Sequence, residues 1–136
     1  MTNEEKKYKS PRDLPLYTAV YKLLKLVDQM VYTFNRDRKH TLGQAIYRTV
    51  LEMFEPLRIA YDFPEQREDA LVTLLGKFDM VQTMLKLCNE REYIRKDIYL
   101  EMARPLASIE RQANGWLIST RIAGVSDMGI AESASI

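Results

Sequence analysis

The chain has only one cysteine and one histidine, which narrows the chemistry open to it. A single thiol, Cys88, excludes a disulfide framework, and its place on the apolar side of a helical pattern is typical of a buried structural cysteine. The single histidine, His40, cannot supply the two inward Glu-x-x-His pairs that di-metal helical bundles use. The sequence also has no glycine-rich phosphate loop. We therefore predict a protein without enzymatic activity, with no bound metal and no cofactor.

Glycine and proline are also scarce, with five of each. Few helix breakers favour long helices over a fold of strands and turns. No apolar run approaches the roughly 20 residues that cross a membrane. The first residues are charged with no apolar segment behind them, so they do not resemble a secretion signal. We expect a cytoplasmic protein with no membrane partner.

Apolar residues at helical spacing fill most of the chain instead. They form four segments joined by short polar links, at about residues 16–34, 41–63, 65–89 and 95–120. Short links between amphipathic helices favour antiparallel neighbours, so we predict an all-α, antiparallel up-down-up-down four-helix bundle. Thr41 and Gln44 fit a capping box at the start of the second helix, and Pro56 is expected to kink that helix.

The two ends of the chain lack this periodicity. Residues 1–13 are polar and charged, and we expect a flexible N-terminal lead. Residues 14–122 form the predicted bundle. Residues 123–136 are small and aperiodic, which predicts a disordered tail.

The second predicted helix is apolar on two faces. One stripe runs through Ile46, Val50 and Leu57, and a second stripe lies on roughly the opposite side. A small bundle needs only one apolar face per helix, so the second stripe favours burial between copies of the chain in a homo-oligomeric ring. The alternative is that the second helix is central and covered by the other three. The predicted oligomer interface consists of Tyr47, Leu51, Phe54 and Tyr61, with Tyr17 and Tyr21 of the first helix.

Basic residues are concentrated in part of this nearly neutral chain, whose net charge is +1. Residues 1–40 carry nine lysines and arginines against five acidic residues. A basic cluster follows the first helix, near Tyr32 and Tyr47, and two arginines seven residues apart share an outer face of the fourth helix. Cations interleaved with aromatic rings are typical of nucleic-acid surfaces, although each cation alone is also compatible with a solvated face. The predicted nucleic-acid-binding residues are Arg36, Arg38, Lys39, His40, Arg104 and Arg111.

Three short motifs carry a family resemblance over about residues 14–120. They are Leu14-Pro15-Leu16-Tyr17, Leu42-Gly43-Gln44 and Gly115-Trp116-Leu117. With them the chain resembles the accessory variability determinant proteins of diversity-generating retroelements. That family is related to four-helix-bundle proteins encoded in intervening sequences of bacterial large-subunit ribosomal RNA genes.

The resemblance implies a bundle assembled as a ring-shaped homopentamer, with a basic surface for RNA or an RNA–cDNA intermediate and a dock for a reverse transcriptase. Such a protein supports mutagenic reverse transcription without supplying a catalytic group. Members of the family are often clearly basic, whereas the net charge of this chain is only +1. The residues after Ile122 include Asp127 and Glu132 but no lysine or arginine. The alternative function is therefore an oligomeric scaffold, of the intervening-sequence type, with no nucleic-acid role.

Overall fold

The structure is a computed structural model that describes residues 8–135, and the side chains of residues 8–125. Throughout this range the chain forms helices and turns, with no strand. The principal helices are α1 (Pro15–Tyr32), α2 (Arg36–Arg38), α3 (Gln44–Leu51), α4 (Phe54–Asp62), α5 (Arg67–Glu90) and α6 (Lys96–Ser135). Three short elements join them: η2 (Pro11–Asp13), the π-helical turn η3 (Lys39–Gly43) and η4 (Pro64–Gln66).

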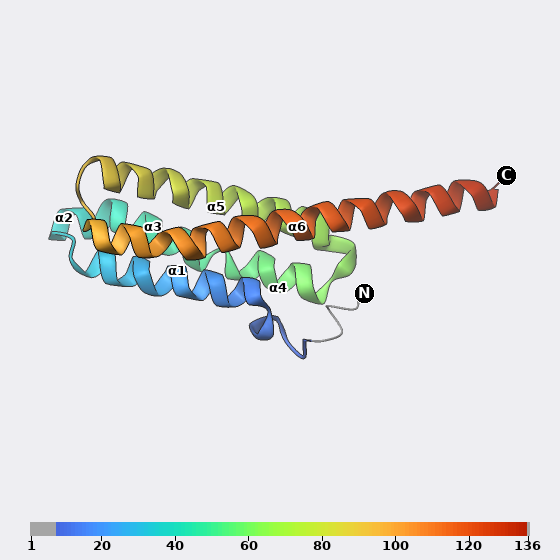
Figure 1. The fold of residues 1–136 in the computed structure, drawn as a ribbon, viewed down its shortest axis with the longest axis horizontal. Helices are drawn as coiled ribbons and strands as arrows, with labels where there is room; N and C mark the ends of the chain where they lie inside the picture. The colour runs from blue at the N-terminus through green and yellow to red at the C-terminus, as the bar shows by residue number, and fades with distance from the viewer. Residues whose placement is uncertain (1–7, 136) are drawn as a thin grey trace.

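These elements form four antiparallel rods, and the predicted all-α four-helix bundle is confirmed (Figure 1). The first, third and fourth rods are α1, α5 and α6, and the second is the broken run from α2 to α4. α1 packs against α6 on one side and α3 on the other, and α5 packs against α3, α4 and α6. None of the described helices is both long enough and apolar enough to cross a membrane.

The second rod begins earlier than the sequence predicted. The Asn35 side chain caps it, because its Oδ1 accepts a hydrogen bond from the Arg38 backbone N–H at 2.8 Å. The segment that we predicted as a polar link is therefore helical through α2 and η3. The predicted capping box is wrong: the Thr41 hydroxyl donates to the Asp37 carbonyl at 3.0 Å from inside the helical run. Asparagine is among the most favoured N-cap residues, and Asn35 precedes Thr41 in the chain. The helical run therefore begins at Asn35.

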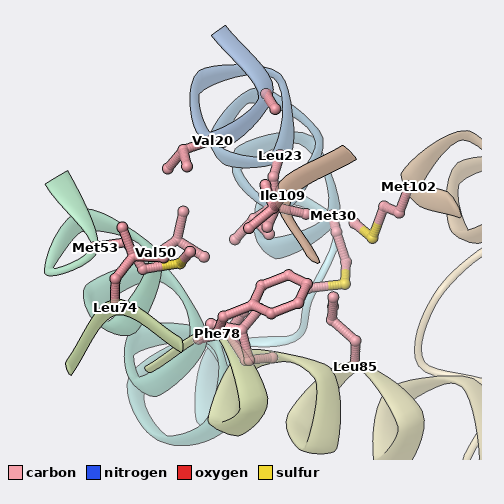
Figure 2. Packing of buried hydrophobic residues seen from close by; sticks show 14 of the residues in the cluster. Val20, Leu23, Met30, Val50, Met53, Leu74, Phe78, Leu85, Met102 and Ile109 are labelled. Atoms are coloured by element: carbon pink, nitrogen blue, oxygen red, sulfur yellow. The ribbon is translucent and has the colours of Figure 1, made fainter. Parts of the chain in front are cut away.

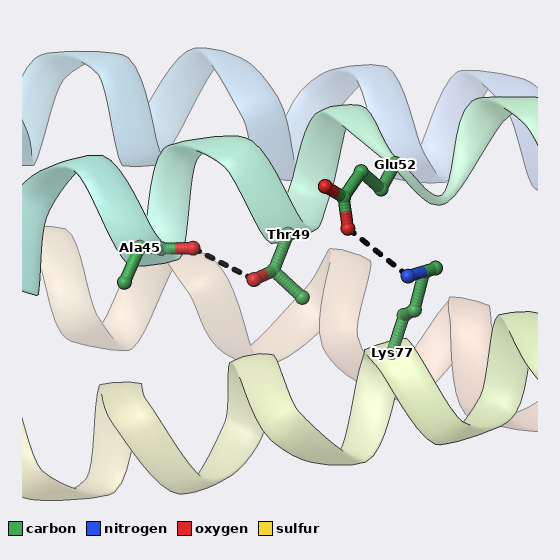
Figure 3. Close-up of polar contacts among 4 residues, drawn as sticks. All are labelled: Ala45, Thr49, Glu52 and Lys77. Atoms are coloured by element: carbon green, nitrogen blue, oxygen red, sulfur yellow. Dashed lines mark hydrogen bonds and ion pairs between the residues drawn. The ribbon is translucent and has the colours of Figure 1, made fainter.

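The interruption expected from Pro56 is present. α3 ends at Leu51 and α4 begins at Phe54, so Pro56 lies in the first turn of α4. A proline is tolerated there because the first backbone N–H groups of a helix have no intrahelical partner. Lys77 of α5 forms an ion pair with the second rod next to this break, because its Nζ lies 3.0 Å from Glu52 Oε2 (Figure 3).

The core lies between the four rods and is built from the predicted apolar stripes. Phe78 of α5 stands at its centre, near Met30 and Leu85, and Met102 and Ile109 of α6 close it from the opposite side (Figure 2). These five side chains are buried. Each fully buried residue of this size removes enough apolar surface from water to contribute about 1.5–3 kcal/mol.

The fourth rod is longer than predicted. α6 continues as a helix to Ser135 and projects beyond the rest of the bundle (Figure 1). The predicted disordered tail is therefore helical up to that residue, and residue 136 lies outside the described range. No proline follows Pro105 in the chain, and a glycine such as Gly124 costs only about 1 kcal/mol in a helix interior.

The N-terminal lead is partly ordered. Residues 1–7 of the predicted flexible lead lie outside the described residues, but η2 forms a helical turn directly before α1. The Tyr61 hydroxyl of α4 donates a hydrogen bond to the Tyr8 carbonyl oxygen. The segment before α1 thus packs against α4 of the second rod and covers part of its surface.

Candidate nucleic-acid interface

A groove runs between α1 and α6 on the surface of the bundle. Its charged lining consists of Lys22, Lys25, Arg104, Arg111, Asp13 and Glu101. Cations therefore outnumber acids, with two cations on each of the two long walls. Within residues 8–125, none of the four cations forms an ion pair with a protein carboxylate.

Helical spacing explains how the groove is built. Lys22 and Lys25 lie one turn apart on α1, and Arg104 and Arg111 lie two turns apart on α6. The core stripes of both helices point inward, which leaves these cations along the rim. The space between the walls is hollow because its lining includes small side chains, namely Ala19, Ala103, Ala107 and Ser108.

This arrangement is suited to a polyanion. These four cations have no acidic partner among the described residues, so each can contact a phosphate and release a condensed counterion, which is the main source of affinity for nucleic acid. Sequence reasoning identified Arg104 and Arg111, which the structure places beside Lys22 and Lys25. It missed the two lysines as site residues, because they appeared only as part of the N-terminal excess of positive charge.

The predicted basic cluster lies at one end of the bundle, on α2 and η3. Arg36 and His40 are exposed there, whereas Arg38 is half-buried. The Arg38 Cζ lies 3.5 Å from the ring centroid of Tyr93 and 5.6 Å from that of Phe34. The Arg38 guanidinium thus packs against two rings of the same chain.

The link between α5 and α6 contributes two further residues to this end, and sequence reasoning missed both. The Tyr93 ring, which the Arg38 guanidinium contacts, also lies 5.9 Å from the Cζ of Arg91. The Arg91 guanidinium, by hydrogen bonding and by its charge, lowers the pKa of the Tyr93 hydroxyl, and Arg38 adds to this effect. Polar sequence in the link gave no sign that Tyr93 would bridge to the second rod.

The predicted oligomer interface divides into covered and exposed residues. Leu51 and Tyr21 are exposed, at 45% and 49% of their surface. The other four pack partly against the core of the same chain: Tyr17, Tyr47, Phe54 and Tyr61. Tyr17 and Phe54 meet edge to face, with ring centroids 5.1 Å apart. Three of the four residues of the second stripe, Tyr47, Phe54 and Tyr61, are therefore half-buried within the single chain. The Tyr17 ring contacts Phe54, and the Tyr8 carbonyl contacts Tyr61.

Other apolar side chains are exposed as well. On α5 they are Val72, Met80 and Leu87, which recur at two-turn intervals along its outer face. This outer face of α5 lies on a different rod from the α1–α6 groove. It is available to a protein partner or to another copy of the chain.

The single cysteine of the chain lies in the core. Cys88 is fully buried, and burial raises the pKa of its thiol to about 11, although the Arg38 charge opposes this. The thiol therefore stays protonated and unreactive near neutral pH. Among the residues that the structure describes, no three histidine, cysteine or acidic side chains are grouped so that they could hold a metal ion.

Comparisons of this chain with protein-family models, with curated proteins and with solved structures gave no match. The family resemblance of the three motifs therefore stays a prediction. The features of the molecule that bear on function are the α1–α6 groove and the exposed apolar side chains.

Proposed function

We propose that this protein is a non-enzymatic accessory protein of a diversity-generating retroelement. In this proposal a homo-oligomer binds the element's reverse transcriptase together with template RNA or an RNA–cDNA intermediate. Holding enzyme and template on one scaffold raises their effective concentration and thereby supports mutagenic reverse transcription.

The observation that carries the nucleic-acid part is the groove between α1 and α6. It gathers Lys22, Lys25, Arg104 and Arg111 from two distant parts of the chain. A net charge of +1 gives the protein little general attraction for polyanions. Affinity must then come from local concentration of cations, and the groove supplies it.

A direct test is binding of a fluorescently labelled single-stranded RNA, followed by anisotropy as salt is raised. If the four groove cations each contact one phosphate, log K should fall with log salt at a slope of about −2.8. Affinity should then drop about 50-fold between ~50 and ~200 mM salt. Absence of binding at the lower salt concentration would contradict the nucleic-acid role and favour a scaffold.

The alternative, an oligomeric scaffold without nucleic acid, is favoured by the near-neutral charge and by the outer face of α5. Both functions require association between chains, and the resemblance implies a pentamer. Leu51 belongs to the predicted interface, and its apolar side chain is exposed. It is a cleaner probe than Phe54, whose ring packs on Tyr17 within the chain.

We expect Leu51→Asp to convert the oligomer to smaller species, because burying a carboxylate between chains is unfavourable. Light scattering of the purified protein measures the mass directly. Lys86→Asp, at an exposed site on α5, is the control for introducing the same side chain elsewhere. A wild-type protein that is already monomeric at high concentration would remove the ring from the proposal.

A further inference from the structure

Two tyrosines stand exposed on the outer surface of α1. Tyr32 is 81% exposed and Tyr21 is 49% exposed, although both carry large apolar rings. Their separation of eleven residues is close to three helical turns, so both rings lie on the same side of α1, about 16 Å apart along its axis. No described element covers either ring fully.

Each of these rings lies close to a lysine. The Lys25 Nζ is 5.7 Å from the Tyr21 ring centroid, and the Lys39 Nζ is 5.2 Å from that of Tyr32. Lys25 also lines the α1–α6 groove, and Lys39 belongs to the basic end of the bundle. The two rings are therefore flanked by cations from both basic surfaces.

Helical spacing places the rings beside the groove. Tyr32 follows Lys25 by seven residues, and Tyr21 precedes it by four, so the three side chains share one strip of α1 next to the residues that line the groove. The exposed carboxylate of Asp28 lies on the same strip. A strand whose phosphates follow the groove would have its bases within reach of this strip. Proteins that bind single strands without sequence preference combine a basic track with aromatic rings in this way.

We propose that Tyr21 and Tyr32 are base-stacking platforms, which give the groove a preference for single-stranded nucleic acid over duplex. The inference rests on the proposed function, because it requires phosphates in the groove. A duplex keeps its bases stacked on one another, so it offers the rings only its backbone. A single strand can place unpaired bases on the rings, whatever their sequence.

The test compares the Tyr21→Ala/Tyr32→Ala variant with the Tyr21→Phe/Tyr32→Phe variant, which keeps both rings. Anisotropy is measured with three RNA probes of equal length: a single strand, a perfect duplex and a single strand of abasic sites. We expect the alanine variant to lose about tenfold or more in affinity for the single strand. Its affinity for the duplex and the abasic strand should change less than about twofold, and the phenylalanine variant should bind all three like wild type.

The results distinguish a failure of the stacking inference from a failure of the proposed function. Equal losses on all three probes, or no loss on any, would overturn the stacking role while leaving the groove as a phosphate site. Wild-type protein that binds none of the probes would overturn both. A change in mass by light scattering with unchanged RNA affinity would mean that the tyrosines contact another copy of the chain, which also overturns the inference. Circular dichroism confirms that the variants fold.

Discussion

Replacing Lys25 and Arg104 together with glutamate is expected to lower affinity for single-stranded RNA by about 100-fold at ~0.1 M salt. The two residues stand on opposite walls of the groove. Losing two phosphate contacts accounts for about 25-fold, and the new carboxylates add repulsion. The same loss should flatten the slope of log K against log salt by about 1.4. Anisotropy titrations at several salt concentrations measure both quantities.

The matched control is the Arg48→Glu/Lys86→Glu variant. Arg48 and Lys86 are exposed on α3 and α5, and neither lines the groove. The control changes net charge by the same amount, so it reports the general effect of charge on binding. If both double variants lose affinity equally, binding depends on overall charge and the groove is not the site.

Phe78→Ala is expected to reduce the free energy of unfolding by about 3–5 kcal/mol. Phe78 places an aromatic ring at the centre of the core and is only 3% exposed. Removing it leaves a cavity among α1, α3, α5 and α6, which the helices cannot close without losing contacts with one another. Urea unfolding followed by circular dichroism measures the loss, since domains of this size have stabilities of only about 5–15 kcal/mol.

Met80→Ala is the control on the same helix. Its side chain is 55% exposed on the outer face of α5, so the change should cost less than about 0.5 kcal/mol. A Phe78→Ala variant that unfolds at the wild-type urea concentration would mean that the core is not packed as described. A large loss in Met80→Ala would instead indicate that this outer face is buried between copies of the chain.

The sequence was sufficient to predict the bundle because the core stripes repeat over many turns. Leu23 and Val27 of α1, like Leu74 and Phe78 of α5, point inward wherever a helix with that spacing forms. The start of the second rod was mispredicted because Asn35 and Thr41 are both good caps. Only the placement of the following turns selects between them.

The groove could not be predicted in full, because periodicity tells which face of a helix is outward but not which neighbour borders it. Arg104 and Arg111 were visible as a pair on one helix. That Lys22 and Lys25 stand opposite them follows from the packing of α1 on α6. The same limit explains the second apolar stripe, since nothing local to Phe54 or Tyr61 indicates that Tyr17 and the Tyr8 backbone cover them.

The π-helical turn η3 sets how far α2 is rotated about the helix axis relative to α3. The Gln44 backbone N–H bonds to the Lys39 carbonyl, five residues back, so the turn holds one residue more than a regular α-helical turn. Deleting a residue there would regularise the helix but swing everything before it by about 100° around the axis. Arg38 would then leave Tyr93, and Lys39 would leave Tyr32. Insertions and deletions in these five residues should therefore be far less tolerated than substitutions of their exposed side chains.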